Sequence, residues 1–242
     1  MSENGPEELV FQGRIITVRL KSVRYPDGGV SQYVIVDHPD AVGIVALRDG
    51  EESRETGVAQ EPQVALVRQM CPAIDRTSWE MPVGLVAEEE QQHPEDAAAR
   101  ELAEETGYRA DHLRFLARHH PAPGVLNGAI LIYLATGLSL APDHPIPDPN
   151  EIEQLVWKPL SQALDWCRQG IIDDGKTGIS LWCAWDAMDR HKAWLMEQSP
   201  KSSEVNVSRA SEESDDKDDD EEREGRSRLC ITSQAITSVS RA

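Results

Sequence analysis

Residues 100–108 read Arg-Glu-Leu-Ala-Glu-Glu-Thr-Gly-Tyr, and this stretch is the strongest indication of the fold in the whole chain. On an α-helix, Glu101, Glu104 and Glu105 stand at positions i, i+3 and i+4, so their carboxylates point to one side. Three carboxylates this close repel one another unless a cation lies between them. A cluster of hard oxygen ligands suits Mg²⁺ or Mn²⁺, and such an ion would attract phosphate groups.

The helix that carries these glutamates has clear ends in the sequence. Pro94 fits the first helical position, where its missing N–H costs little, and acidic residues follow it at the positive end of the helix dipole. Gly107 stands where a C-terminal glycine is expected. Upstream, residues 79–86 are typical of a strand end that runs into a loop. The sequence therefore predicts a unit of strand, loop and acidic helix.

An acidic run most often marks only a solvated helix face, but the order of residues here is more specific. It resembles the Nudix box, Gly-x5-Glu-x7-Arg-Glu-U-x-Glu-Glu-x-Gly-U, where U is a bulky apolar residue, and few accidental matches have this length. Gly84 and Glu90 fit its first part, and residues 100–108 fit its second part. Nine residues separate Glu90 from Arg100 instead of seven, which indicates a small loop insertion around Gln91-Gln92. The first glutamate of the box is therefore Glu88, Glu89 or Glu90.

Composition excludes several classes of protein. The 242 residues carry a net charge of -19, whereas a general nucleic-acid-binding surface would be basic. A small polyanionic substrate fits, because a metal ion and local arginines can reverse the field inside one cleft. The four cysteines have no paired spacing, so we expect free thiols. Residues 1–6 lack a signal-peptide pattern and no apolar run reaches membrane-spanning length, so we expect a cytoplasmic protein with no nucleic-acid or membrane partner.

The order of the predicted elements is strands, acidic helix, strands and two helices, which is typical of an α+β or α/β/α sandwich fold. We expect an N-terminal antiparallel β-hairpin region at residues 1–38, with a turn at residues 26–29, then a catalytic domain at residues 39–198. Residues 199–242 form an acidic, Ser-rich tail that we expect to be disordered. Further strands are predicted at residues 41–47, 64–70, 113–120, 129–136 and 154–158, and helices at residues 159–168 and 176–197.

Beyond the box, the chain resembles the ADP-ribose pyrophosphatase branch of the Nudix family. The stretches that carry this resemblance are residues 11–39, residues 67–84, Pro123, which lies fifteen residues beyond Tyr108, and residues 157–177. The resemblance implies a Nudix-type α/β/α sandwich with a mixed sheet, and a homodimer that exchanges the N-terminal sheet. Two places depart from the branch: Cys71 replaces a usual second basic residue, and Val125-Leu126-Asn127-Gly128 stands where acidic residues often occur.

Hydrolysis of a diphosphate needs charge neutralisation, a positioned water and a base. We expect Glu101, Glu104 and Glu105 to bind the metal ion, and the resemblance suggests the main-chain carbonyl of Gly84 as a further ligand. Arg100 is expected to orient a glutamate through a bidentate pair, the alternative being a surface i,i+4 pair with Glu104.

Substrate contacts are expected elsewhere. Arg68 is the best candidate for binding a phosphate, and Glu80 either contacts substrate or metal or is a surface acid at a strand end. The branch often takes its general base from a late acidic loop, which favours Glu151 over Glu153, because Glu153 enters the next strand. Adenine stacking, if present, is expected from Tyr25, Tyr33 or a partner subunit's hairpin.

Together these features predict an enzyme that uses Mg²⁺ or Mn²⁺ to hydrolyse the diphosphate bond of ADP-ribose or a related nucleoside diphosphate sugar, giving AMP and ribose 5-phosphate. One alternative is a Nudix pyrophosphatase for another nucleotide sugar or an oxidised nucleotide. The other is a non-catalytic, Nudix-like sensor of nucleotide sugars. The intact helix glutamates and Arg100 favour the enzyme.

Overall fold

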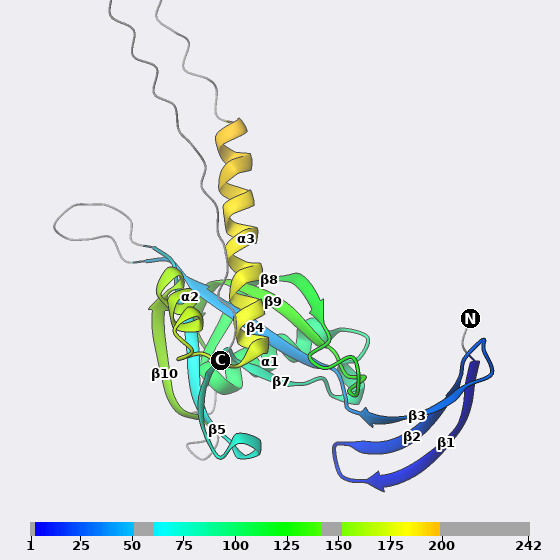
Figure 1. The fold of residues 1–242 in the computed structure, drawn as a ribbon. Helices are drawn as coiled ribbons and strands as arrows, with labels where there is room; N and C mark the ends of the chain where they lie inside the picture. The colour runs from blue at the N-terminus through cyan, green and yellow to red at the C-terminus, as the bar shows by residue number, and fades with distance from the viewer. Residues whose placement is uncertain (1–2, 51–60, 142–151, 199–242) are drawn as a thin grey trace, which may run out of the picture. The chain divides into compact units, whose positions relative to one another are not determined.

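The computed structural model describes residues 3–50, 61–141 and 152–198 (Figure 1). All of them belong to one unit, Met1–Ser199. The predicted tail at residues 199–242 lies outside the described residues. Within the described part of the chain, no helix is both long and apolar enough to cross a membrane.

The N-terminal region is a three-stranded antiparallel sheet. Its strands β1 (Glu3–Gln12), β2 (Thr17–Arg24) and β3 (Val30–Asp37) pair in the order β1-β2-β3. The turn between β2 and β3 closes with a hydrogen bond from the Tyr25 N–H to the Gly29 carbonyl (2.8 Å), and Gly28 has a φ of 87° that favours glycine. The predicted antiparallel region and its turn are confirmed, with one strand more than a simple hairpin.

A second sheet of seven strands forms the centre of the domain. Its main path runs β10-β5-β4-β9-β8, while β6 pairs with β5 and β7 pairs with β4. The β4–β9 pair is parallel and the other pairs are antiparallel, so the sheet is mixed as expected. The strands are β4 (Ala41–Arg48), β5 (Gln63–Cys71), β6 (Arg76–Glu80), β7 (Val83–Leu85), β8 (Tyr108–His119), β9 (Ile130–Leu140) and β10 (Ile152–Pro159).

Helices cover both faces of this sheet, which explains why residues 42–47 of β4 are buried without interruption. On one face, Ile44 packs with Leu102 of α1 (Pro94–Thr106). On the other, Val45 packs with residues of α2 (Leu160–Arg168) and α3 (Gly175–Gln198). Two short 3-10 helices, η1 (Pro72–Ile74) and η2 (Glu88–Glu90), complete the fold, which is the expected α/β/α sandwich.

The acidic helix ends as its sequence predicts. Pro94 is its first residue, and Gly107 caps it with a φ of 73° while donating its N–H to the Ala103 carbonyl. Strand β8 begins directly at Tyr108, earlier than the expected start at residue 113. Its first residues pair with the end of β9, and this tertiary partner extends the strand through a polar stretch that alternation alone did not indicate.

Candidate active site

The site is built where β7 meets α1. Gly84 lies in β7 and pairs with Val42 of β4, and the carboxyl group of Glu101 lies against it. A Cβ atom placed on Gly84 would be 1.9 Å from Cδ of Glu101. Only glycine therefore allows the main chain and this carboxylate to approach so closely.

Arg100 joins this strand to the glutamates of the helix. Its Nε and Nη2 donate to the two oxygens of Glu90 at 2.9 and 3.0 Å, which is a bidentate pair. Its Nη1 donates to Glu101 (2.6 Å) and Glu104 (3.0 Å), and Nη2 also reaches the Leu85 carbonyl at 3.1 Å. The predicted bidentate role and the alternative i,i+4 pair thus exist together in one network.

The bidentate partner of Arg100 is one of the three candidates for the first glutamate of the acidic motif. Glu90 accepts both guanidinium hydrogen bonds and also the N–H of Ala87 at 2.9 Å, and Arg100 lowers the pKa of Glu90. Of the three candidates, Glu90 is thus the one that the structure pairs with Arg100, and its place as the first glutamate of the motif stays a prediction. The two extra residues lie between η2 and α1, so the helix and its glutamates keep their places.

The three helix glutamates differ in environment. The side chain of Glu101 is 12% exposed, and burial raises its pKa although the pair with Arg100 acts in the opposite direction. Glu104 is 46% exposed. Glu105 accepts the N–H of Val83 at 3.3 Å and so faces β7. A divalent cation at this place would favour the ionised form of Glu101, which burial disfavours.

The donor set fits a hard divalent cation in its chemistry. Three carboxylates come from adjacent turns of one helix, and the main chain at Gly84 is packed against one of them. In the arrangement seen here, no three ligating side chains among the described residues converge on one point. Arg100 holds Glu101 and Glu104, while Glu105 is directed to Val83.

Glu80 is buried, with a side chain only 4% exposed, so the alternative that it is a surface acid is wrong. It pairs with Lys176 and accepts hydrogen bonds from Gln69 Nε2 (2.9 Å) and Cys71 Sγ (3.0 Å). Burial alone would raise the pKa of Glu80, but the charge of Lys176 and these hydrogen bonds lower it overall. The same burial, with Glu80 beside it, raises the pKa of Cys71 to about 11, so this free thiol stays protonated. The role of Glu80 as a contact of substrate or metal stays a prediction.

Arg68 lies on the opposite face of β5 from Gln69, because successive side chains of a strand alternate. Its guanidinium donates to Thr77 Oγ1 at 3.1 and 3.0 Å and lies 3.6 Å from Glu153. The structure thus places Arg68 beside Thr77 and Glu153, and its role in phosphate binding stays a prediction. The candidate base Glu151 lies outside the described residues.

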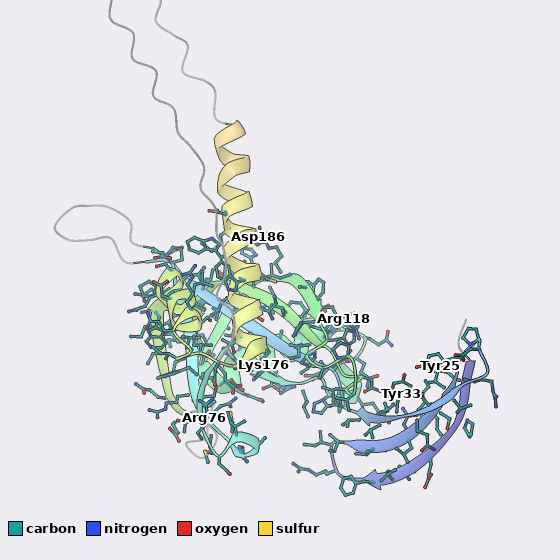
Figure 2. The ribbon with its side chains drawn as sticks, in the orientation of Figure 1. Tyr25, Tyr33, Arg76, Arg118, Lys176 and Asp186 are labelled. Carbon is teal, nitrogen blue, oxygen red and sulfur yellow. The ribbon has the colours of Figure 1, made fainter. Side chains whose placement is uncertain are left out.

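A cavity of about 300 Å³ adjoins Gly84. Its lining includes Leu85, Pro39 and Leu126. Lys176, which is labelled at the start of α3 in Figure 2, also belongs to this lining. The segment that departs from the related branch lies here: Asn127 donates its N–H to the Val36 carbonyl (3.2 Å), which ties this loop to β3.

Lys176 and two tyrosines of the N-terminal sheet have contacts that the sequence did not indicate. Lys176 was given no role, although a lysine in the first turn of a helix is unfavourable for the helix dipole and so calls for a local partner. Tyr25 and Tyr33 place their hydroxyl groups in contact with each other on the N-terminal sheet (Figure 2). Their part in adenine stacking stays a prediction.

Comparisons with known proteins agree with this arrangement. A model of the NUDIX domain matches residues 37–176. The methanol dehydrogenase activator of Bacillus methanolicus is 30% identical over 174 residues, covering 72% of this chain and 87% of that protein. The ADP-ribose pyrophosphatase of Bacillus subtilis (strain 168) is 30% identical over 175 residues, covering 72% and 88%. A crystal structure of an ADP compounds hydrolase shares the fold, with a TM-score of 0.61 at 23% identity over 82% of this chain and 96% of its own.

Proposed function

Since the chain belongs to the NUDIX family and is a Nudix hydrolase of the ADP-ribose pyrophosphatase type, we propose that it hydrolyses the diphosphate bond of ADP-ribose with Mg²⁺, giving AMP and ribose 5-phosphate. The observation that carries this proposal is the contact between Gly84 and the Glu101 carboxylate, with Arg100 bridging Glu90, Glu101 and Glu104. Nudix hydrolases use divalent metal ions, and the carboxylates in this network are suitable ligands for one.

In this proposal, Glu101, Glu104, Glu105 and the carbonyl of Gly84 hold the metal ion. When bound, Mg²⁺ supplies positive charge to the diphosphate and acidifies the attacking water. Arg100 keeps Glu101 and Glu104 oriented, and its bidentate pair with Glu90 fixes the guanidinium itself.

Arg68 binds one phosphate of the substrate, and Glu80 is a second substrate-binding residue. Glu151 removes the proton from the attacking water. These roles come from the sequence. The position of Arg68 beside Glu153 places the proposed phosphate contact next to the start of β10, which follows Glu151 in the sequence.

A second candidate substrate is a different nucleoside diphosphate sugar. The loop at residues 125–128 carries no acidic side chain, and Leu126 together with Pro39 makes the cavity beside Gly84 largely apolar. A terminal sugar bound there would find few hydrogen-bonding side chains, so this cavity would discriminate weakly between sugars.

A substrate panel tests this proposal. Purified protein with Mg²⁺ should show its highest kcat/KM for ADP-ribose among nucleoside diphosphate sugars, oxidised nucleotides and nucleoside triphosphates, measured by release of nucleoside monophosphate. Triphosphates hydrolysed far faster at equal concentration would contradict the substrate assignment. If nothing is hydrolysed while ADP-ribose raises Tm, the protein is a nucleotide-sugar sensor instead.

The proposal includes a homodimer and a cytoplasmic location, both expected from the sequence. In support of the dimer, the N-terminal sheet exposes a group of large apolar side chains, which is typical of an interaction surface. They are Leu9, Val10, Phe11, Val30 and Val34. Light scattering should give the mass of two chains at micromolar concentration, and the mass of one chain would contradict the assignment.

A further inference from the structure

The first turn of α3 is tied to the segment that leads into the active site. The Lys176 ammonium pairs with Glu80, at the end of β6, and lies 3.0 Å from Asp174 Oδ1. The neighbouring Thr177 is fully buried, and its hydroxyl accepts the N–H of Met81 at 2.9 Å while donating to Asp174 Oδ2 at 2.6 Å. Lys176 and Thr177 of α3 thus contact Glu80 and Met81, at the end of β6.

This placement of Lys176 is costly unless its partners are in place. Its side chain is only 22% exposed, and a cation in the first turn of a helix meets the positive end of the dipole. Burial by itself lowers the pKa of Lys176, but Asp174 and Glu80 raise it overall, so the ammonium stays charged. Removing it would leave Glu80 buried without its counter-ion, which is strongly unfavourable.

The other end of the same segment lies against the acidic helix. Gly84 follows Glu80 by four residues and contacts the Glu101 carboxylate. Between them, the Pro82 carbonyl accepts the N–H of Ile44 at 2.8 Å, and the Val83 N–H reaches Glu105 at 3.3 Å. Residues 80–84 are therefore fixed by α3 at one end and by α1 at the other.

Lys176 also lines the cavity beside Gly84, so the residue that holds one end of the segment and the glycine at its other end border the same space. The ammonium has two carboxylate partners already, which leaves it poorly suited to bind a phosphate as a free cation. Its contacts are better suited to set the position of the segment than to bind substrate.

We propose that Lys176 is a positioning residue for the divalent-metal site: held by Glu80 and Asp174, it fixes residues 80–84 and thereby the place of Gly84 against Glu101. This inference rests on the proposed function for the metal site, but it does not depend on which nucleotide sugar is the substrate. The role of Lys176 is separate from that of the metal ligands, since its contacts reach them only through the strand segment.

The test compares Lys176→Met with Arg76→Met by titration of Mn²⁺, followed by electron paramagnetic resonance. Arg76 is a matched control because it also connects β6 to the segment before α3, through an exposed pair with Asp173. Lys176→Met should weaken Mn²⁺ binding about 10-fold or more, as supporting residues of metal sites do, while Arg76→Met should match the wild type. Lys176→Arg should recover part of the affinity.

The double variant Glu80→Gln with Lys176→Met separates an effect on overall stability from an effect on the metal site. It replaces the buried ion pair by neutral side chains of similar size. It should recover Tm relative to Lys176→Met, because Glu80, the more deeply buried of the two carboxylates, is neutralised as well and Asp174 keeps its hydrogen bonds from Thr177, yet keep the weak Mn²⁺ affinity. If Lys176→Met or the double variant folds and binds Mn²⁺ as tightly as the wild type does, the proposal is overturned. It is also overturned if the wild type binds no Mn²⁺. Failure of the wild type to hydrolyse ADP-ribose, with the Mn²⁺ shift intact, would refute only the substrate assignment.

Discussion

The variant Glu104→Gln should lose at least about 100-fold in kcat while its Tm stays close to that of the wild type. The substitution keeps the size of the side chain and the helix propensity but removes one charge from the proposed metal ligands. Glu104 is half exposed and its described partner is Arg100, in an i,i+4 pair at 3.0 Å. Such pairs stabilise a helix by only about 0.5 kcal/mol or less, and relief of repulsion from Glu101 acts in the opposite direction.

The matched control is Glu95→Gln on the same helix. Glu95 lies in the first turn, is exposed, and contacts His93 rather than Arg100. Its replacement removes the same charge from the same helix, so kcat should be unchanged. Near-normal turnover in Glu104→Gln, or an equal loss in both variants, would contradict the assignment of Glu104 to the site. Steady-state rates with saturating Mg²⁺, together with thermal melts without metal, provide both quantities.

The second large effect is expected for Gly84→Ala. The added methyl group would stand 1.9 Å from Cδ of Glu101, so the carboxylate must move away from the strand. Because this is the flexible end of a side chain, the fold should survive with a cost of about 1–3 kcal/mol. The activity should fall about 100-fold or more, since the main chain and Glu101 can no longer lie together.

Gly124→Ala is the control for this variant. Gly124 has open space where a Cβ atom would be placed and lies in the loop after Pro123. Its replacement should leave kcat and Tm unchanged. A Gly84→Ala enzyme with wild-type kcat would show that the contact between Gly84 and Glu101 is not needed for catalysis. Chemical denaturation of both variants separates the loss of stability from the loss of activity.

The features predicted correctly from the sequence depend on local signals. The acidic helix carries its own start at Pro94 and its own end at Gly107, and its spacing alone places three carboxylates on one side. The strands have the expected apolar patterns, and the box sets the order of strand, loop and helix. Each of these signals lies within a few consecutive residues of the sequence, so no tertiary contact is needed to infer the feature.

The features that the sequence could not predict depend on distant contacts. From the sequence, Glu80 either contacts substrate or metal or is a surface acid, but its pairing with Lys176 joins residues that are 96 positions apart. The choice of Glu90 over its two neighbours required the position of the Arg100 guanidinium. The sequence gives no reason to prefer one of three adjacent glutamates. The conformation of η2 places the side chain of Glu90 against Arg100.

The most direct test of the central claim is hydrolysis of ADP-ribose in ¹⁸O-labelled water with Mg²⁺. The account predicts AMP and ribose 5-phosphate in equal amounts, with one labelled oxygen on only one of the two phosphates, and no products once the metal ion is chelated. Products that form equally well without a divalent metal ion, or cleavage elsewhere than at the diphosphate, would contradict it.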